Sequence, residues 1–225
     1  MKKVLSGLLL GAACATSAQA ALQTFQFTAN INSVRDSNTE ALVESGTVEG
    51  KVIARGEKVV GTLTFDLATN GWDHFSTDDS KAFEYDGLSI EAQFVDSGLT
   101  TKNESGGYVR VTDGTAGIEH DELRVVAQKY SYDPHYMSSF VLVTTDESGQ
   151  LLNSTDATTQ QFMLLKGAAF NFNVYAQKDT GEFGWTYFSG DITSMTPLSA
   201  VPEPGTYAML LGGLGLIGWR RRKSV

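Results

Sequence analysis

The sequence contains a single cysteine and few basic residues outside its two ends. Cys14 lies in an N-terminal apolar run that we expect to be removed, which excludes a disulfide framework, a cysteine zinc site and a nucleophilic thiol. Six of the seventeen lysines and arginines lie in the terminal segments, so residues 21–201 hold eleven basic and twenty-five acidic side chains. The resulting net charge of about −14 argues against nucleic acid and anionic lipid as partners. It is compatible with solubility or with divalent-cation contact.

Motifs for common enzyme chemistries are also missing. The chain has no G-x-S-x-G elbow, P-loop, H-E-x-x-H pair or D-x-D-x-D-G calcium loop. The spacing Gly213-x-Gly215-x-x-Gly218 fits a dinucleotide-binding turn, but the seven residues that follow cannot form a βαβ unit. Twenty-five acidic side chains permit many carboxylate pairs for glycoside hydrolysis and point to none of them. We therefore predict no enzyme and no cofactor.

Histidines and clustered acidic residues are the only candidates for a metal site. In Glu119-His120-Asp121-Glu122, alternate side chains on a strand would point to opposite faces, so only two could converge. Further ligands would have to come from elsewhere, and the candidates are His135, the Asp73-His74 pair and the Asp78-Asp79 pair. Solvated loop charge is the preferred interpretation, and we predict no metal site.

Aromatic residues are more suggestive, because exposed rings stack on sugar rings and other CH-rich ligand faces. The Tyr130-x-Tyr132 spacing places two rings on one side of a strand, and a turn at residues 133–136 follows. A β-rich core and strand edges also use large aromatics, so a structural role is the preferred interpretation. The candidate ligand-stacking residues are Trp72, Tyr130, Tyr132, Tyr136 and Trp185.

The N-terminus has the features of a secretory signal peptide. Lys2 and Lys3 precede an apolar run from Val4 to Ala15, and Ala18-Gln19-Ala20 forms a small-residue cleavage site. We predict cleavage before Ala21 after export by the Sec machinery. An N-terminal core helix and a lipoprotein site at Cys14 are less favoured alternatives.

The C-terminus combines a short apolar segment with a basic cluster. Residues 206–219 carry no charge, and as a helix they would reach about 21 Å. This length is short of a hydrocarbon core of about 30 Å. The basic cluster Arg220-Arg221-Arg222-Lys223 would stay on the cytoplasmic side and leave the main domain outside. The segment is therefore expected to hold the chain in the inner membrane only transiently.

The residues before this segment carry a specific resemblance. Pro202 and Pro204 flank Glu203, and two prolines keep the stretch extended and accessible. Pro202-Glu203-Pro204, a glycine-rich apolar helix and a terminal arginine cluster together resemble the PEP-CTERM sorting signal of Gram-negative bacteria over about the last 25 residues. The resemblance implies that an exosortase-type processing enzyme removes the tail and delivers the protein to the cell surface or extracellular matrix. A retained membrane anchor is the alternative.

The middle of the chain consists of short stretches rich in Val, Ile, Thr, Phe and Tyr, separated by Gly, Asn and Asp. Gly50–Arg55 and Lys58–Phe65 are expected to form a hairpin, and residues 146–160 a surface loop. The other predicted strands are Thr24–Val34, Leu88–Val95, Tyr108–Thr112, Glu122–Tyr130, Ser139–Thr144, Gln161–Leu165, Ala169–Ala176 and Phe183–Ile192.

About ten strands without intervening helices predict an all-β antiparallel fold, a β-sandwich or jelly-roll-like single domain. The expected organisation is a signal peptide at 1–20, an exported domain at 21–200 and a sorting signal at 201–225. A non-catalytic cell-surface or matrix protein is the preferred function. A carbohydrate-binding module for extracellular polysaccharide is the first alternative and a secreted hydrolase the second.

Overall fold

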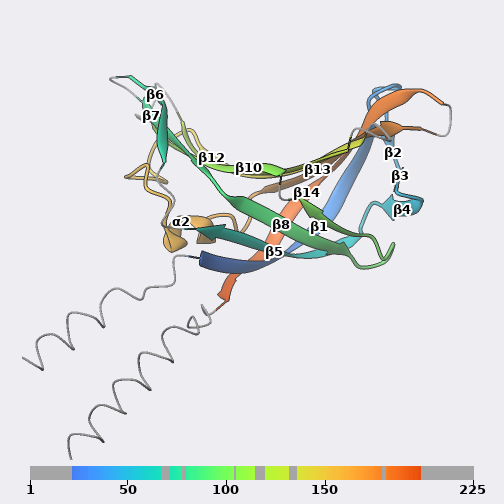
Figure 1. Cartoon of the computed structure of the whole chain (residues 1–225), viewed down its shortest axis with the longest axis horizontal. Helices are drawn as coiled ribbons and strands as arrows, with labels where there is room; N and C mark the ends of the chain where they lie inside the picture. The colour runs from blue at the N-terminus through green and yellow to red at the C-terminus, as the bar shows by residue number, and fades with distance from the viewer. Residues whose placement is uncertain are drawn as a thin grey trace, which may run out of the picture. The chain divides into compact units, whose positions relative to one another are not determined.

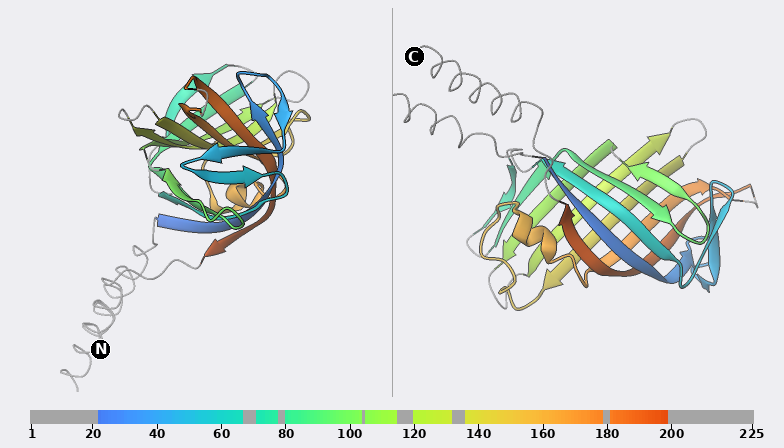
Figure 2. Two further views of the ribbon diagram at one scale, coloured as in Figure 1. Left: turned by 90° about the vertical axis from the view of Figure 1, so that its right-hand side faces the viewer. Right: turned by 90° about the horizontal axis from the view of Figure 1, so that it is seen from below.

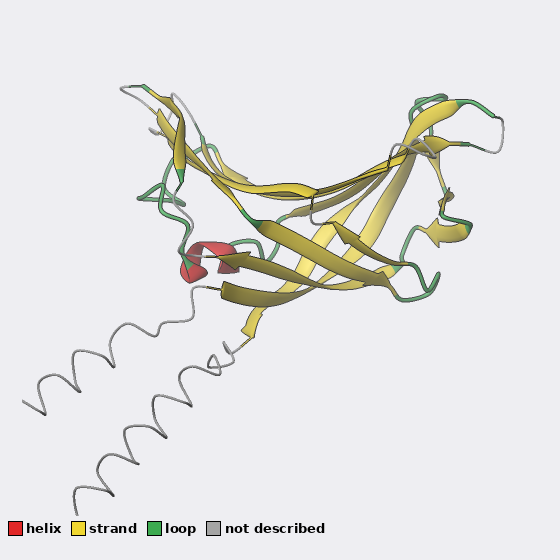
Figure 3. Cartoon of the chain, viewed as in Figure 1, coloured by secondary structure: helices red, strands yellow, loops and turns green. Residues whose placement is uncertain are grey.

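In the computed structural model, residues Leu22–Leu198 are almost entirely β-structure and form a unit of their own (Figures 1 and 3). Within it the described residues are 22–66, 71–77, 80–103, 105–114, 120–131, 136–178 and 181–198. The predicted signal peptide and sorting signal lie outside these residues, including Ala18, Ala20 and Ala21.

The unit contains fourteen described strands and one short helix. They are β1 (Leu22–Asp36), β2 (Leu42–Val43), β3 (Ser45–Val48), β4 (Lys51–Ala54), β5 (Lys58–Asp66), β6 (Trp72–Ser76), β7 (Ser80–Asp86), β8 (Leu88–Phe94), β9 (Thr100–Asn103), β10 (Ser105–Gly114), β11 (Asp121–Ser131), β12 (Tyr136–Asp146), α2 (Thr159–Met163), β13 (Ala169–Gln177) and β14 (Phe183–Leu198).

Twelve of these strands form one antiparallel sheet in the order β6-β7-β10-β11-β12-β13-β14-β1-β5-β8-β9, with β2 paired to β1. The sheet curls into a half-barrel, and its β1–β5–β8 part forms the wall opposite β10–β13 (Figures 1 and 2). β3 and β4 form a separate hairpin. The predicted all-β antiparallel fold is confirmed, but one continuous sheet folds over its own core where two packed sheets were expected.

Phenylalanines from both walls fill the space between them. The Phe172 ring lies 4.7 Å from that of Phe140, 5.9 Å from that of Phe188 and 5.1 Å from that of Phe94 on the opposite wall, all distances between centroids. All four side chains are fully buried. Because side chains alternate along a strand, burying Phe170, Phe172 and Val174 turns their neighbours on β13 outward.

The helix α2 replaces a predicted strand. Residues 161–165 were expected to be extended, but Thr158 and Gln161 form a reciprocal capping box that starts a helix at Thr159. The helix inserts Phe162 between the two walls, with ring centroids 4.9 Å from Phe25 and 5.4 Å from Phe65. The segment has one ring to bury, that of Phe162, and a short helix is enough to place this ring in the core.

The predicted hairpin between residues 50–55 and 58–65 is wrong. β4 pairs with β3, whereas β5 pairs with β1 and β8. The turn at Gly56, with a φ of +87°, redirects the chain between the two pairings. Its amide donates to Ile31 O at 2.7 Å, which joins the turn to β1.

Candidate ligand-binding face

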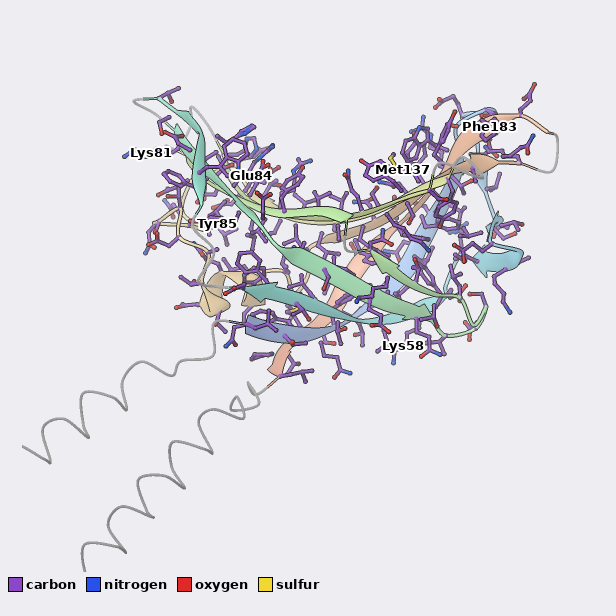
Figure 4. The ribbon with its side chains drawn as sticks, viewed as in Figure 1. Lys58, Lys81, Glu84, Tyr85, Met137 and Phe183 are labelled. Atoms are coloured by element: carbon purple, nitrogen blue, oxygen red, sulfur yellow. The ribbon has the colours of Figure 1, made fainter. Side chains whose placement is uncertain are left out.

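The part of the sheet that runs β6-β7-β10-β11-β12-β13-β14-β1 turns one set of alternating side chains away from the core, and we call this surface the outer face. Register places Met137, Tyr175 and Trp185 directly opposite one another across β12, β13 and β14. Figure 4 shows Met137 and Glu84 on this side of the sheet, with Tyr85 on the other. The strands bow so that their two ends rise around this face (Figure 1).

Four rings on β13 and β14 form an aromatic strip, defined as Tyr175, Phe183, Trp185 and Tyr187. Trp185 and Tyr187 lie nearly parallel, 6.0 Å apart with 9° between their planes. Tyr175 lies 5.4 Å from Trp185 and 5.9 Å from Phe183. Phe183 is 41 % exposed and the other three are partly exposed. The strip therefore gathers four partly exposed aromatic rings on one part of the outer face.

The backbone of Trp185 is held at several points. Its amide donates to Ser37 Oγ at 2.8 Å, and its carbonyl accepts from Ser37 N and Lys178 Nζ at 3.0 and 3.2 Å. Lys178 Nζ also lies 2.6 Å from Asp36 Oδ1, and hydrogen bonding to this lysine lowers the pKa of the Asp36 carboxyl. These contacts fix the strand that carries the indole.

Beside the aromatic strip, the outer face is hollowed by about 630 Å³. The floor carries amide and hydroxyl groups alternating with buried phenylalanines, because Asn171 and Asn173 flank Phe172 on β13. Amides and hydroxyls both donate and accept hydrogen bonds, as sugar hydroxyls do. The lining residues are Ser33, Arg35, Glu40, Leu42, Arg124, Val141, Asn171, Asn173, Tyr187 and Ser189.

Arginines on this face are each paired with a glutamate. Arg124 binds Glu122 through Nε and Nη2 at 2.8 and 2.7 Å, and this hydrogen bonding raises the arginine pKa. Arg110 Nε and Nη2 both donate to Glu84 Oε2, at 3.1 and 2.7 Å. Arg35 similarly donates to Glu40. The pairs leave hydrogen-bonding groups at the surface with little net charge.

The five aromatic candidates from the sequence have different fates. Tyr130 and Trp72, 51 % and 47 % exposed, lie on the outer face with Trp185. Tyr136 points to the opposite side, where it packs against the core and burial raises its pKa to about 12. Tyr132 lies outside the described residues.

Sequence reasoning missed most of the residues that make this face. Tyr175, Phe183 and Tyr187 were not singled out, nor were Asn171 and Asn173. The available signal was the alternation along residues 170–175, in which Phe or Val alternates with Asn or Tyr. That pattern marks a strand with one buried side and one side suited to polar and aromatic contacts.

The acidic cluster around His120 is dispersed in the fold. Asp121 is fully buried and accepts from Gly114 N at 2.9 Å and Leu152 N at 2.7 Å, so it joins the end of β10 to the segment between β12 and α2. Glu122 pairs with Arg124. Within the described ranges, no group of three or more His, Cys, Asp or Glu side chains is placed to hold a metal ion. Glu119, His135 and Asp78-Asp79 lie outside those ranges.

The comparisons with known proteins concern the C-terminus. No curated protein and no solved structure shows significant similarity to the chain. In the part of the chain that the structure describes, no helix is long and apolar enough to cross a membrane. The predicted helix at 206–219 falls outside that part, as do Pro202-Glu203-Pro204 and Arg220-Arg221-Arg222-Lys223.

One family does match. Residues 200–223 fit the PEP-CTERM protein-sorting motif, and they include the Pro-Glu-Pro tripeptide, the apolar segment and the basic cluster. Proteins with this motif are exported, processed by an exosortase and sorted to the cell surface. The C-terminus of this chain therefore carries a PEP-CTERM protein-sorting motif.

Proposed function

We propose that the exported domain is a non-catalytic surface protein that binds polysaccharide through the outer face. The observation that carries the proposal is the aromatic strip beside a hollow lined with amide, hydroxyl and guanidinium groups. Sugar rings present apolar CH faces and polar edges. Flat rings next to donors and acceptors match both.

Charge pairing on the outer face supports binding over hydrolysis. A glycoside hydrolase needs two carboxyl groups facing the scissile bond, one of them able to donate a proton. The carboxylates Glu40, Glu84 and Glu122 on this face each bind an arginine instead. Their oxygens already accept hydrogen bonds from guanidinium groups of the protein, an arrangement that suits the orientation of polar side chains for binding.

The destination that the sorting motif implies supports the same function. An exported protein delivered to the cell surface meets the polysaccharide that surrounds the cell. Binding without catalysis would attach the protein to that layer after the tail has been removed.

Affinity electrophoresis in gels containing polysaccharide from the producing bacterium tests the proposal. We expect the wild type to be retarded and Trp185→Ala to lose about tenfold in affinity, since one stacking contact is removed. Val95→Ala is the control, because Val95 is 48 % exposed and follows β8, away from the outer face. Equal retardation of all three proteins, or none of the wild type, would overturn the proposal.

A further inference from the structure

A second aromatic platform lies on the outer face at edge strand β6. Trp72 is 47 % exposed, and its ring meets that of His74 edge-on at 5.5 Å. His74 Nδ1 lies 3.8 Å from Glu84 Oε2 on β7. Register places Trp72 opposite Glu84, which Figure 4 shows on the outer face. Trp72 and Trp185 therefore belong to one surface.

Polar groups connect the two platforms. Glu84, Arg110 and Arg124 lie opposite one another on β7, β10 and β11. Arg124 borders the hollow, whose other side is lined by Tyr187 of the aromatic strip. A ligand that leaves Trp72 thus meets Glu84, Arg110 and Arg124 before it reaches the hollow beside the aromatic strip.

The separation of the platforms exceeds the size of a small sugar. β6 and β14 are six steps apart in the sheet order, which corresponds to about 29 Å measured along the sheet. The register rows of Trp72 and Trp185 also cross β11 at Arg124 and Tyr130 respectively, about 20 Å apart along the strand. A mono- or disaccharide on either platform cannot reach the other.

The electrostatics of the outer face indicate an uncharged occupant. The domain is strongly acidic, which disfavours a polyanionic chain, and Arg110, Arg124 and Arg35 already bind glutamates. A protein partner is disfavoured as well, because the centres of protein interfaces are depleted in charged residues. Here paired charges lie between the aromatic platforms.

We infer, building on the proposed function, that the ligand is an uncharged linear polysaccharide whose chain spans the outer face and contacts both Trp72 and Trp185. Each tryptophan binds a different part of the same chain. Both platforms together hold a long segment more tightly than either does alone. Once the chain is bound at one platform, its contact with the second forms within the same complex and at a high effective concentration.

Calorimetric titration of the processed protein from its native host tests this. The probes are the neutral fraction of the host polysaccharide, the di- and trisaccharides released from it by partial hydrolysis, and its uronate-containing fraction. We expect Trp72→Ala to weaken binding of the long neutral chain by about tenfold. The affinity of the short fragments for the aromatic strip should not change, because they do not reach Trp72 from there. Trp72→Phe, which keeps a ring, should restore most of the affinity, and the uronate fraction should bind more weakly than the neutral one.

The outcomes separate this inference from the proposed function. If Trp185→Ala weakens the long chain and Trp72→Ala does not, the aromatic strip is a complete site, and the spanning chain is wrong while glycan binding stands. If the trisaccharide binds the wild type as tightly as the polymer, the same conclusion follows. If no fraction binds the wild type, both proposals fail. Tighter binding of the uronate fraction would overturn the uncharged ligand alone.

Discussion

Tyr175 and Trp185 lie directly opposite each other on β13 and β14, with their ring centroids 5.4 Å apart on the outer face. Cross-strand aromatic pairs of this kind stabilise a sheet modestly. Both rings are partly exposed and lie beside a hollow whose lining includes Asn171 and Asn173. The pair therefore connects the register of two strands to the ligand that the domain is proposed to bind.

The sorting motif gives the first prediction. Replacing Pro202, Glu203 and Pro204 with alanine should leave the C-terminal tail on the protein in its native host. The reason is that this tripeptide belongs to the sorting motif at residues 200–223, which implies processing by an exosortase. Intact mass and cell fractionation check this: the wild type should lose both ends and leave the inner membrane, while the variant should stay there.

Pro197→Ala is the matched control, because Pro197 precedes the motif and lies in β14, where it pairs with Phe25 of β1. It should be processed like the wild type. A wild type that keeps its full C-terminal mass would contradict the prediction.

The helix α2 gives the second prediction. Phe162→Ala should destabilise the domain by about 3 to 5 kcal/mol, since it empties the space between Phe25 and Phe65. Gln160→Ala, on an exposed position of the same helix, should change the free energy of unfolding by less than about 0.5 kcal/mol. Urea unfolding followed by circular dichroism compares them, and similar midpoints would show that α2 does not close the core.

The buried phenol of Tyr136 gives the third prediction. Burial raises its pKa from about 10 to about 12, so the unfolded chain loses this proton at a lower pH than the folded one. The corresponding stability is fully present below pH 10 and is lost as the pH rises towards 12. Tyr136→Phe should therefore lose less stability than the wild type over this range.

Chemical denaturation at several alkaline pH values measures the effect. Tyr130→Phe is the control, because it removes the same hydroxyl group from a half-exposed position outside the core. Parallel slopes for wild type and Tyr136→Phe would mean that another group controls alkaline unfolding.

Part of the fold follows directly from residue alternation. The predicted strands at 24–34, 58–65, 88–95 and 169–176 coincide with β1, β5, β8 and β13 within a few residues. In each, apolar side chains on one side meet a core and their neighbours do not, and this pattern is visible in sequence.

Other elements depend on tertiary contacts that a single segment does not reveal. β9 was missed because its inward residues are polar: Thr101 and Asn103 are buried, and Asn103 Nδ2 donates to Ala127 O at 3.3 Å across the core. The strand predicted at 161–165 became α2 because the Thr158–Gln161 capping box outweighs local β propensity.

The outer face could be predicted only in part for a related reason. Trp72, Tyr130 and Trp185 were recognised by residue type, but their common surface depends on the register of seven strands. Tyr136 was grouped with Tyr130 because the two are close in sequence. They lie on neighbouring strands with opposite orientation, since Tyr130 pairs with Met137 rather than with Tyr136.

Calorimetric titration of the producing bacterium's polysaccharide into the processed wild-type protein and into Trp185→Ala/Tyr175→Ala tests glycan binding by the outer face most directly. We expect saturable binding by the wild type and a loss of at least about tenfold in the double variant, with only a modest fall in its unfolding midpoint. Binding of equal strength by both proteins, or no binding by the wild type, would contradict glycan binding by the outer face.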